Sequence, residues 1–247
     1  MARFFRKLTA SFLKRYHLAL HGGYSVGEAY GRRFLLDWRH PIDKKLALEL
    51  FEHERILYFM GKVERLKPQM FLDIGAHAAL YTVLATARVP GMAAHAFEPD
   101  PANLGQLHAN LFLNRLSSAV VVHPHGLSNH EGTVGFAASD EHEHRAFSRV
   151  SESGGVRIPV RRLDDVLDAR GLTVAVKIDV EGHELSVVEG AKGFLSGNRC
   201  YLQIESGPEN LPRLKEAMAA LGYRLVASMG DHYFTNLPDE AFGGAAA

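Results

Sequence analysis

The stretch DIGAHAALYT, residues 73–82, follows a short apolar run typical of a buried strand and precedes an apolar helical pattern. An acid, a glycine and small residues between a strand and a helix are typical of a turn that binds a nucleotide-like cofactor. A dinucleotide needs two or three glycines to cradle its pyrophosphate, and this turn has only Gly75. S-adenosylmethionine carries no phosphate, so the stretch favours S-adenosylmethionine as the cofactor.

Strands and helices alternate along the chain from this turn onward. Strands are expected at MFLDI, AAHAFEP, AVVVHP, TVAVKIDV and RCYLQIE, with helices between them. This alternation predicts an α/β fold with a mostly parallel, Rossmann-like sheet that helices cover on both faces. The segments LVASMG and HYFTNL predict an antiparallel hairpin at the C-terminal edge, and GTVGFAAS predicts a short strand. One helix is expected over residues 43–66, and another after an N-cap at Asp100.

Length and composition fit one domain with an N-terminal extension, because the chain has 247 residues of which 47% are hydrophobic. The single cysteine, Cys200, fits a reducing compartment. An apolar run of about 18 residues would indicate a transmembrane helix, and the sequence has none. Since the N-terminus also lacks the pattern of a signal peptide, we expect a cytoplasmic protein.

Charge is unevenly distributed along the chain, although the net charge is zero. Residues 1–70 hold 14 basic and 7 acidic residues, and residues 1–20 hold five basic residues and no acidic one. The apolar residues of this first segment roughly follow helical spacing, which predicts a basic amphipathic helix. We favour packing of this helix on the main domain, with peripheral contact to an anionic membrane surface as the alternative.

Acidic residues follow most of the predicted strands at the point where each strand ends: Asp73, Glu98, Asp179, Glu181 and Glu205. The carboxyl ends of parallel strands meet at one edge of a sheet, where ligands bind. Five acids at this edge indicate a ligand rich in hydroxyls, amines or positive charge. Glu98 also lies 25 residues after Asp73, close to the interval at which an acid binds ribose hydroxyls.

Five segments occur in an order that resembles the FkbM-type S-adenosylmethionine-dependent methyltransferases: DIGAHAALYT, AFEPDPANLGQLHANLFLN, GLSNHEGTVGF, VRRLDD and VKIDVEGHELSVVEGA. The resemblance covers roughly residues 50–206, and KIDVEGHE is its most specific part. It implies a class I methyltransferase fold. We expect a methyltransferase domain over residues 51–247 and an N-terminal helical extension over residues 1–50. It also implies methyl transfer to a hydroxyl of a sugar, a polyketide or a related metabolite.

The resemblance assigns roles by position. It implies cofactor binding by three groups of residues: Asp73, Gly75, Ala76, His77, Tyr81 and Thr82 in the first motif, Glu98 and Pro99 at the ribose, and Leu127 and Ser128 beside the adenine. Lys177, Asp179, Glu181, Gly182 and Glu184 match the motif near the methyl-transfer centre. The family pattern has asparagine where this chain has His77 and a second glycine where it has Ala79. If position 79 needs a positive φ, alanine is strained there by roughly 1 kcal/mol.

A hydroxyl acceptor needs help to lose its proton, and Asp179 is our first candidate for the catalytic base, with Glu181 and His183 nearby. The alternatives are a cofactor-binding or helix-capping role for Asp179 and a surface position for His183. We assign Glu205 to the substrate. A divalent cation held by Asp179, Glu181 and Glu205 is an alternative that we do not favour, so no metal site is assigned.

Three further histidine features remain outside this assignment. The run EHEH at residues 141–144 lies in a polar loop over residues 137–157, which we interpret as solvated or as a lid over the acceptor. His123 and His125 follow the third strand, either as walls of the pocket or as hydrogen-bonded polar groups.

The sequence therefore predicts an S-adenosylmethionine-dependent O-methyltransferase that acts on a sugar, a glycoconjugate or a related small molecule, and no nucleic-acid partner. One alternative is an N-methyltransferase or a polyketide O-methyltransferase on the same fold. The other is a catalytically impaired binding module, with its cofactor pocket weakened at His77 and Ala79, that uses the basic N-terminus to bind a partner or a membrane.

Overall fold

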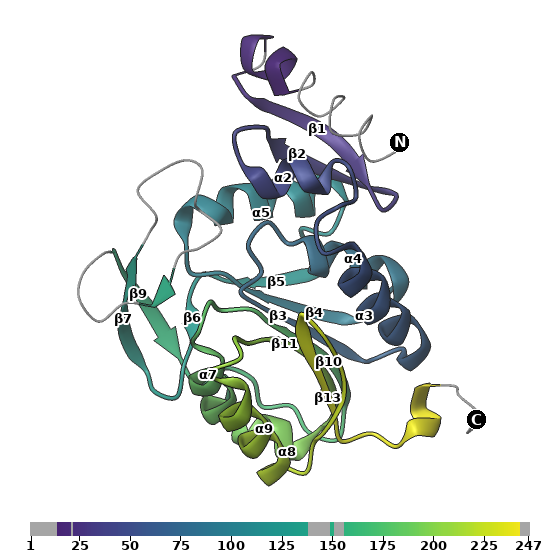
Figure 1. The fold of residues 1–247 in the computed structure, drawn as a ribbon, viewed down its shortest axis with the longest axis vertical. Helices are drawn as coiled ribbons and strands as arrows, with labels where there is room; N and C mark the ends of the chain where they lie inside the picture. The colour runs from purple at the N-terminus through teal and green to yellow at the C-terminus, as the bar shows by residue number, and fades with distance from the viewer. Residues whose placement is uncertain (1–13, 21, 138–148, 151–155, 243–247) are drawn as a thin grey trace.

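The computed structural model describes residues 14–20, 22–137, 149–150 and 156–242. A seven-stranded sheet forms its centre, with the strand order β12-β13-β11-β10-β3-β4-β5 (Figure 1). Five strands run parallel: β3 (Met70–Ile74), β4 (Ala93–Phe97), β5 (Val120–His123), β10 (Thr173–Ile178) and β11 (Arg199–Glu205). β13 (Asp231–Thr235) pairs antiparallel with both β11 and β12 (Arg224–Met229). The predicted parallel sheet with an antiparallel C-terminal edge is confirmed.

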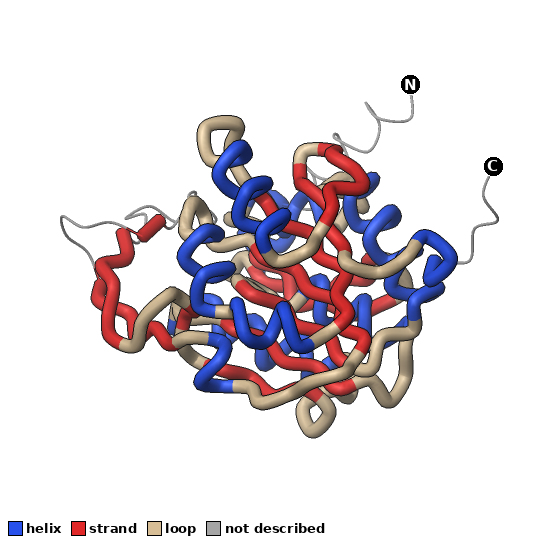
Figure 2. The backbone as a smooth tube through the Cα atoms, turned by 90° about the horizontal axis from the view of Figure 1, so that it is seen from below, coloured by secondary structure: helices blue, strands red, loops and turns tan. Residues whose placement is uncertain are grey.

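Helices cover both faces of this sheet, because alternate side chains of the strands enter different cores. In β3, Phe71 packs into one hydrophobic cluster, and Leu72 and Ile74 pack into the other. The first face is covered by α3 (His53–Leu66), α4 (Leu80–Arg88) and α5 (Pro101–Leu113). The second face is covered by α6 (Leu163–Val166), α7 (Glu184–Gly190), α8 (Lys192–Gly197) and α9 (Leu211–Ala220), and Figures 1 and 2 show the resulting layers.

The start of α5 agrees with the sequence prediction, whereas the helix predicted before β3 is divided in two. Asp100 caps α5 as predicted, since its Oδ1 accepts a hydrogen bond from the amide of Ala102 at 2.8 Å. The prediction of one helix over residues 43–66 is wrong, because the segment forms α2 (Pro41–Leu46) and α3, which are separated by a turn. Glu49 and Glu52 in this turn have φ values of 51° and 45°, which no helix accommodates.

The N-terminal extension contains more than the predicted helix. Residues 14–20 are helical, and residues 1–13, with most of the predicted basic helix, lie outside the described part. An antiparallel hairpin of β1 (Tyr24–Ala29) and β2 (Arg32–Asp37) follows and was not predicted. The hairpin lies beside α5, at the end of the molecule marked by the N-terminus in Figure 1.

A second sheet, of order β6-β9-β7-β8, flanks the carboxyl end of β5. It consists of β6 (Gly126–Leu127), β7 (Gly132–Ala137), β8 (Arg149–Val150) and β9 (Val156–Arg161). The strand predicted at GTVGFAAS is therefore confirmed as β7, although its membership of a separate sheet was not predicted. The EHEH run and most of the predicted lid loop lie outside the described residues.

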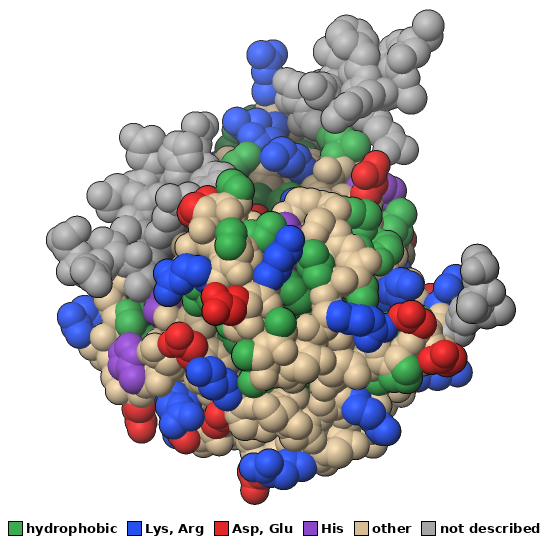
Figure 3. Space-filling view, turned by 60° about the horizontal axis from the view of Figure 1, so that its bottom comes forward, with side chains coloured by type: hydrophobic (Ala, Val, Ile, Leu, Met, Phe, Trp, Pro, Cys, Tyr) green, Lys and Arg blue, Asp and Glu red, His purple; other side chains and the backbone are tan. Residues whose placement is uncertain are grey.

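Basic and acidic side chains are interspersed over the face shown in Figure 3. Within the described residues, no helix combines the length and the apolar character that crossing a membrane requires.

Candidate functional site

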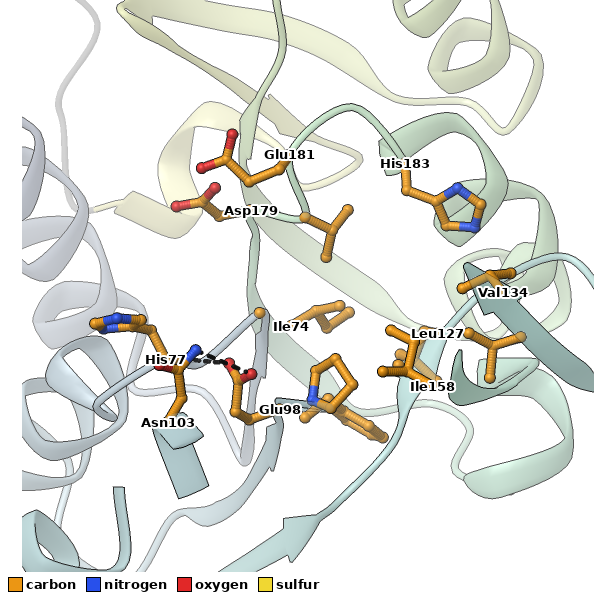
Figure 4. A pocket seen from close by; sticks show the side chains of 16 residues that line it. Ile74, His77, Glu98, Asn103, Leu127, Val134, Ile158, Asp179, Glu181 and His183 are labelled. Carbon is orange, nitrogen blue, oxygen red and sulfur yellow. Dashed lines mark hydrogen bonds between the residues drawn. The ribbon is translucent and has the colours of Figure 1, made fainter. Parts of the chain in front are cut away.

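A pocket opens where β3, β4 and β10 end, between the main sheet and the second sheet (Figure 4). β3 and β10 are adjacent, and the chain order reverses between them, which is where open α/β sheets bind their ligands. Three strand ends and one helix contribute these lining residues: Gly75 and His77 after β3, Glu98 and Pro99 after β4, Asn103 in α5, and Asp179, Glu181 and His183 after β10.

Gly75 allows the end of β3 to touch the end of β10. Its φ is 81°, and a Cβ atom there would lie 1.8 Å from the carbonyl oxygen of Asp179. The amides of Gly75 and Ala76 both donate to the carbonyl of Phe97 at 3.0 Å, which fixes the turn against β4. Any side chain at position 75 would separate the strands, so the single glycine of the stretch is the one that the turn requires.

The two positions that depart from the family pattern both adopt left-handed backbone conformations. His77 has a φ of 47° and Ala79, the N-cap residue of α4, a φ of 62°. Asparagine and glycine tolerate this region better than other residues, which is the physical reason for the family pattern. The condition for strain at Ala79 is met, at a cost of about 1 kcal/mol relative to glycine.

Glu98 is buried in the wall of the pocket and is held by three donors. Its Oε2 accepts from the amide of His77 at 2.7 Å, and its Oε1 accepts from the amide of Asp100 at 2.9 Å and from Nδ2 of Asn103 at 3.3 Å. Burial raises the pKa of Glu98 to about 7, although the hydrogen bonds oppose this shift. A carboxylate has about four lone-pair sites, so Glu98 can still accept a bond from a ligand hydroxyl.

The remaining wall of the pocket is apolar and comes largely from the second sheet. It consists of Phe97, Leu127, Val134, Ile158 and Val160, on β4, β6, β7 and β9. Leu127, Val134 and Ile158 lie together on the side of the pocket away from His77 (Figure 4). A buried acid beside an apolar slot fits a nucleoside, because the ribose hydroxyls can bond to the acid and the flat base can pack in the slot.

Five of the ten predicted cofactor residues line this pocket, namely Gly75, His77, Glu98, Pro99 and Leu127. Asp73 lies behind the turn, where its Oδ2 accepts from the amide of Thr82 at 2.9 Å and from the hydroxyl of Thr82 at 2.6 Å. This pair anchors the first turn of α4 to β3, and burial raises the pKa of Asp73 to about 6. Ala76 and Ser128 are buried beside the pocket, and Tyr81 faces a different group of side chains.

Asp179 is paired with Lys177, whose Nζ lies 2.8 Å from Oδ2 of Asp179. Burial opposes ionisation of Asp179, but the Lys177 ammonium and further hydrogen bonds hold the pKa of Asp179 below its usual value. Burial and the Asp179 carboxylate together raise the pKa of Glu205 to about 9. At neutral pH the two carboxyl groups therefore hold one proton between them, and Glu205 carries it.

A closed ring of hydrogen bonds adjoins this pair. Tyr81 donates to Oε2 of Glu52 at 2.9 Å and receives a bond from Nε2 of Gln203 at 3.0 Å. Nε2 of Gln203 also contacts Asp231, and Asp231 is bonded to Arg55. Arg55 closes the ring through Nη2, which lies 3.0 Å from Oε1 of Glu52. Tyr81 was expected from the first motif, whereas the other four residues of the ring were not predicted.

A second hollow opens on the outer side of this ring. It is lined by Glu49, Leu50, Glu52, His53, Glu54, Arg55 and Met229. Oxygen atoms of Glu52, Asp179 and Glu205 lie within 4.8 Å of one another. Asp179 also lines the first pocket, so this group of carboxylates lies between the two hollows.

The acidic group differs from the metal-ligand set considered from the sequence. Among the described residues, Glu52 joins Asp179 and Glu205, and Glu181 is not part of the set. Lys177 already pairs with Asp179, and Arg55 already pairs with Glu52. Two fixed cations thus neutralise two of the three carboxylates, and we assign no metal to them.

The histidines occupy separate places. His183 lines the pocket apart from Asp179 and Glu181 (Figure 4), with its Nε2 2.9 Å from the hydroxyl of Ser128. Burial lowers the pKa of His183, which favours its neutral form. His123 stacks on Phe97 at a centroid distance of 4.3 Å and shares a hydrogen bond with His95. His125 contacts the carbonyl of Gly126, so His123 and His125 fit the alternative of hydrogen-bonded polar groups.

Comparison with known proteins agrees with this geometry. Residues 73–225 match the Methyltransferase FkbM domain family. Over 180 residues the chain is 28% identical to the hexuronic acid methyltransferase AglP of Haloferax volcanii, which covers 69% of this chain and 65% of that protein. The crystal structure of methyltransferase FkbM from Methylobacillus flagellatus has the same fold, with a TM-score of 0.51 and 18% identity over 78% of this chain and 54% of that chain. The chain thus spans slightly less than two thirds of the first relative and about half of the second, and over more than half of its length it belongs to the FkbM methyltransferase family.

Proposed function

We propose that this protein is an S-adenosylmethionine-dependent O-methyltransferase whose acceptor is a hydroxyl of a sugar or glycoconjugate. The observation that carries the proposal is the position of Asp179. Asp179 lines the first pocket and also belongs to the carboxylate group beside the second hollow. One group of carboxylates therefore borders the donor pocket through Asp179 and the hollow assigned to the acceptor through Glu52.

On the donor side, Glu98 would hold the ribose, and Phe97, Leu127 and Ile158 would enclose the adenine. When bound, S-adenosylmethionine supplies an electrophilic methyl group on a positively charged sulfur. Asp179, Glu52 and Asp231 outnumber Lys177 and Arg55, the cations bonded to them, and this negative balance stabilises positive charge in the neighbourhood. The left-handed Ala79 is strained by only about 1 kcal/mol, which corresponds to a roughly fivefold effect and is too little to abolish binding. This argues against the impaired binding module.

On the acceptor side, the Asp179–Glu205 pair would remove the proton of the attacking hydroxyl. Lys177 makes Asp179 alone a weak base, whereas Glu205 has a raised pKa and is protonated in the ligand-free chain. Positive charge placed beside the pair favours its fully ionised form, which frees the more basic Glu205 carboxylate. Glu205 then accepts the hydroxyl proton while Asp179 stays paired with Lys177.

The charge of the second hollow selects among acceptors. Glu49, Glu52 and Glu54 line it, and Arg55, the cation that lines it, is already bonded to Glu52 and Asp231. A carboxylate on the acceptor would meet these acids with no free Lys or Arg among the described lining residues, so a neutral or amino sugar is favoured over a uronate. The same acids keep an amine protonated and without its lone pair, which favours O-methylation over N-methylation.

A transfer assay tests this proposal. The full chain is incubated with S-adenosylmethionine and, separately, a neutral methyl glycoside, an amino-sugar glycoside and a glucuronide, and methylated products are identified by mass spectrometry. We expect O-methylation of the neutral or amino sugar and at most weak methylation of the glucuronide. Preferential methylation of the glucuronide contradicts the acceptor assignment, and methylation only of nitrogen contradicts the proposed chemistry.

A further inference from the structure

Helix α5 presents a polar stripe to the N-terminal hairpin. Gln106, Asn110 and Asn114 are four residues apart, so their side chains lie on one face of the helix. Four helical residues rise by about 6 Å, and two residues of a strand rise by roughly 6.6 Å. The stripe can therefore match alternate residues along a strand that runs beside the helix.

β2 is that strand. Asn114 bonds both polar groups of the Arg33 backbone, with its Oδ1 3.2 Å from the amide and its Nδ2 2.7 Å from the carbonyl. Oδ1 of Asn110 accepts from the amide of Leu35 at 2.7 Å, and Nε2 of Gln106 donates to the carbonyl of Leu35 at 2.8 Å. Helix side chains thus take the place of a neighbouring strand along the outer edge of β2.

Asn110 also bonds to the turn after β3, a contact that is not seen for Gln106 or Asn114 among the described residues. Its Nδ2 donates to the carbonyl of Ala78 at 2.8 Å. Ala78 lies between His77 and Ala79, the two residues with left-handed conformations in the turn that borders the pocket. Asn110 is completely buried, so water cannot replace either of its bonds.

A ring contact joins the same two regions. His40, which precedes α2, stacks on His77 at a centroid distance of 5.7 Å. His77 lines the pocket, and its amide donates to Glu98. The turn over residues 77–79 is therefore held by Glu98 on the side of the pocket and by Asn110 and His40 on the side of the N-terminal extension.

We infer that Asn110 is a positioning residue that couples the N-terminal hairpin to the cofactor turn, so that docking of the hairpin and binding of S-adenosylmethionine strengthen each other. The inference rests on the proposed function for the identity of the ligand. By reciprocity, the ligand must stabilise the docked hairpin by the same factor by which the docked hairpin improves ligand binding.

Asn110→Asp tests this coupling, because aspartate keeps the oxygen that accepts from Leu35 and loses the donor to Ala78. Asn114→Asp is the matched control, since it makes the same chemical change on the same stripe without touching the turn. For Asn110→Asp we expect calorimetry to show S-adenosylmethionine binding weakened by about tenfold or more. In hydrogen exchange of the ligand-free chain, the amides of residues 77–79 should also exchange faster. In Asn114→Asp both quantities should stay within about twofold of wild type.

Equal effects of the two substitutions on affinity and on turn exchange would overturn the inference. If Asn110→Asp does not fold, His40→Ala provides the second test, with the same two readouts expected to change in the same direction and no change overturning the inference. Absence of binding by the wild type would contradict the proposed function. The exchange comparison would then still decide whether Asn110 couples the hairpin to the turn.

Discussion

Lys177 and Asp179, two residues apart at the end of β10, form an ion pair with 2.8 Å between Nζ and Oδ2. Lys177 is buried, and its Nζ also lies over the ring of Tyr81, 4.8 Å from the centroid. The ammonium keeps Asp179 ionised in the wall of the first pocket.

Asp179→Asn should lower turnover by roughly a hundredfold or more, since it removes the charge that orients and stabilises the proton-accepting pair. The dissociation constant for S-adenosylmethionine should change much less. Single-turnover kinetics and calorimetry on the same preparation separate the two quantities. Equal losses in both would assign Asp179 to cofactor binding, the alternative left open by the sequence.

Glu205→Gln should change how stability depends on pH. Burial and Asp179 raise the pKa of Glu205 to about 9, whereas an unfolded glutamate titrates near about 4.3. The folded chain thus keeps a proton that the unfolded chain has lost, so this group's contribution to stability is complete below about pH 4 and falls as the pH rises to about 9. Glutamine mimics the protonated form and removes this loss.

The comparison runs from pH 7 to pH 9, and subtracting the wild type removes the titration of Glu98 and Asp73, whose pKa values of about 7 and about 6 are shared by both proteins. We expect the melting temperature of Glu205→Gln to exceed that of wild type by more at pH 9 than at pH 7. A difference that is constant across this window would show that Glu205 is not protonated in the folded chain.

At about pH 8, where Glu98 with its pKa of about 7 is mostly ionised, Glu98→Gln should weaken S-adenosylmethionine binding by about tenfold or more, because hydrogen bonds to a charged acceptor contribute about 1.5–3 kcal/mol. The amide keeps the shape of the side chain and one acceptor oxygen. Glu131→Gln is the control, since Glu131 is exposed and its ion pair within the described residues is a long one, 3.7 Å from Arg161. Affinities that stay the same in both variants would show that the ribose assignment is wrong.

Ala79→Gly should stabilise the protein by about 1 kcal/mol, because glycine adopts the left-handed conformation of position 79 without strain. Cofactor affinity should rise or stay unchanged. Ala219→Gly, at an exposed position in α9, should instead destabilise by roughly 0.5–1 kcal/mol. Denaturant unfolding measures both, and loss of stability in Ala79→Gly would contradict the strain at this residue.

The main sheet could be predicted from the sequence because its strands are short apolar runs bounded by turn residues, and each run has a helix beside it. The N-terminal hairpin could not. Its turn has Tyr30 at a φ of 52° before Gly31, whereas such turns are recognised by asparagine, aspartate or glycine at the first position. The end of α2 was missed for the same reason, since Glu49 and Glu52 give no signal of their left-handed conformations.

The candidate site likewise contains residues that the sequence predicted and residues that it did not. Glu98, Asp179 and Glu205 were found because strand ends gather at one edge of a parallel sheet. The ring partners were missed because their contacts join distant parts of the chain, as with Arg55 and Asp231, which are 176 residues apart. The apolar wall was missed apart from Leu127, since Val134 and Ile158 belong to a second sheet that no local pattern indicates.

Calorimetric titration of the full chain with S-adenosylmethionine tests the central claim most directly. The account predicts one binding site per chain and a rise in melting temperature on binding, with both effects reduced in Glu98→Gln. A titration of the wild type that gives no heat and no thermal shift at roughly millimolar cofactor would contradict it, because an affinity weaker than this corresponds to less than about 4 kcal/mol of binding free energy.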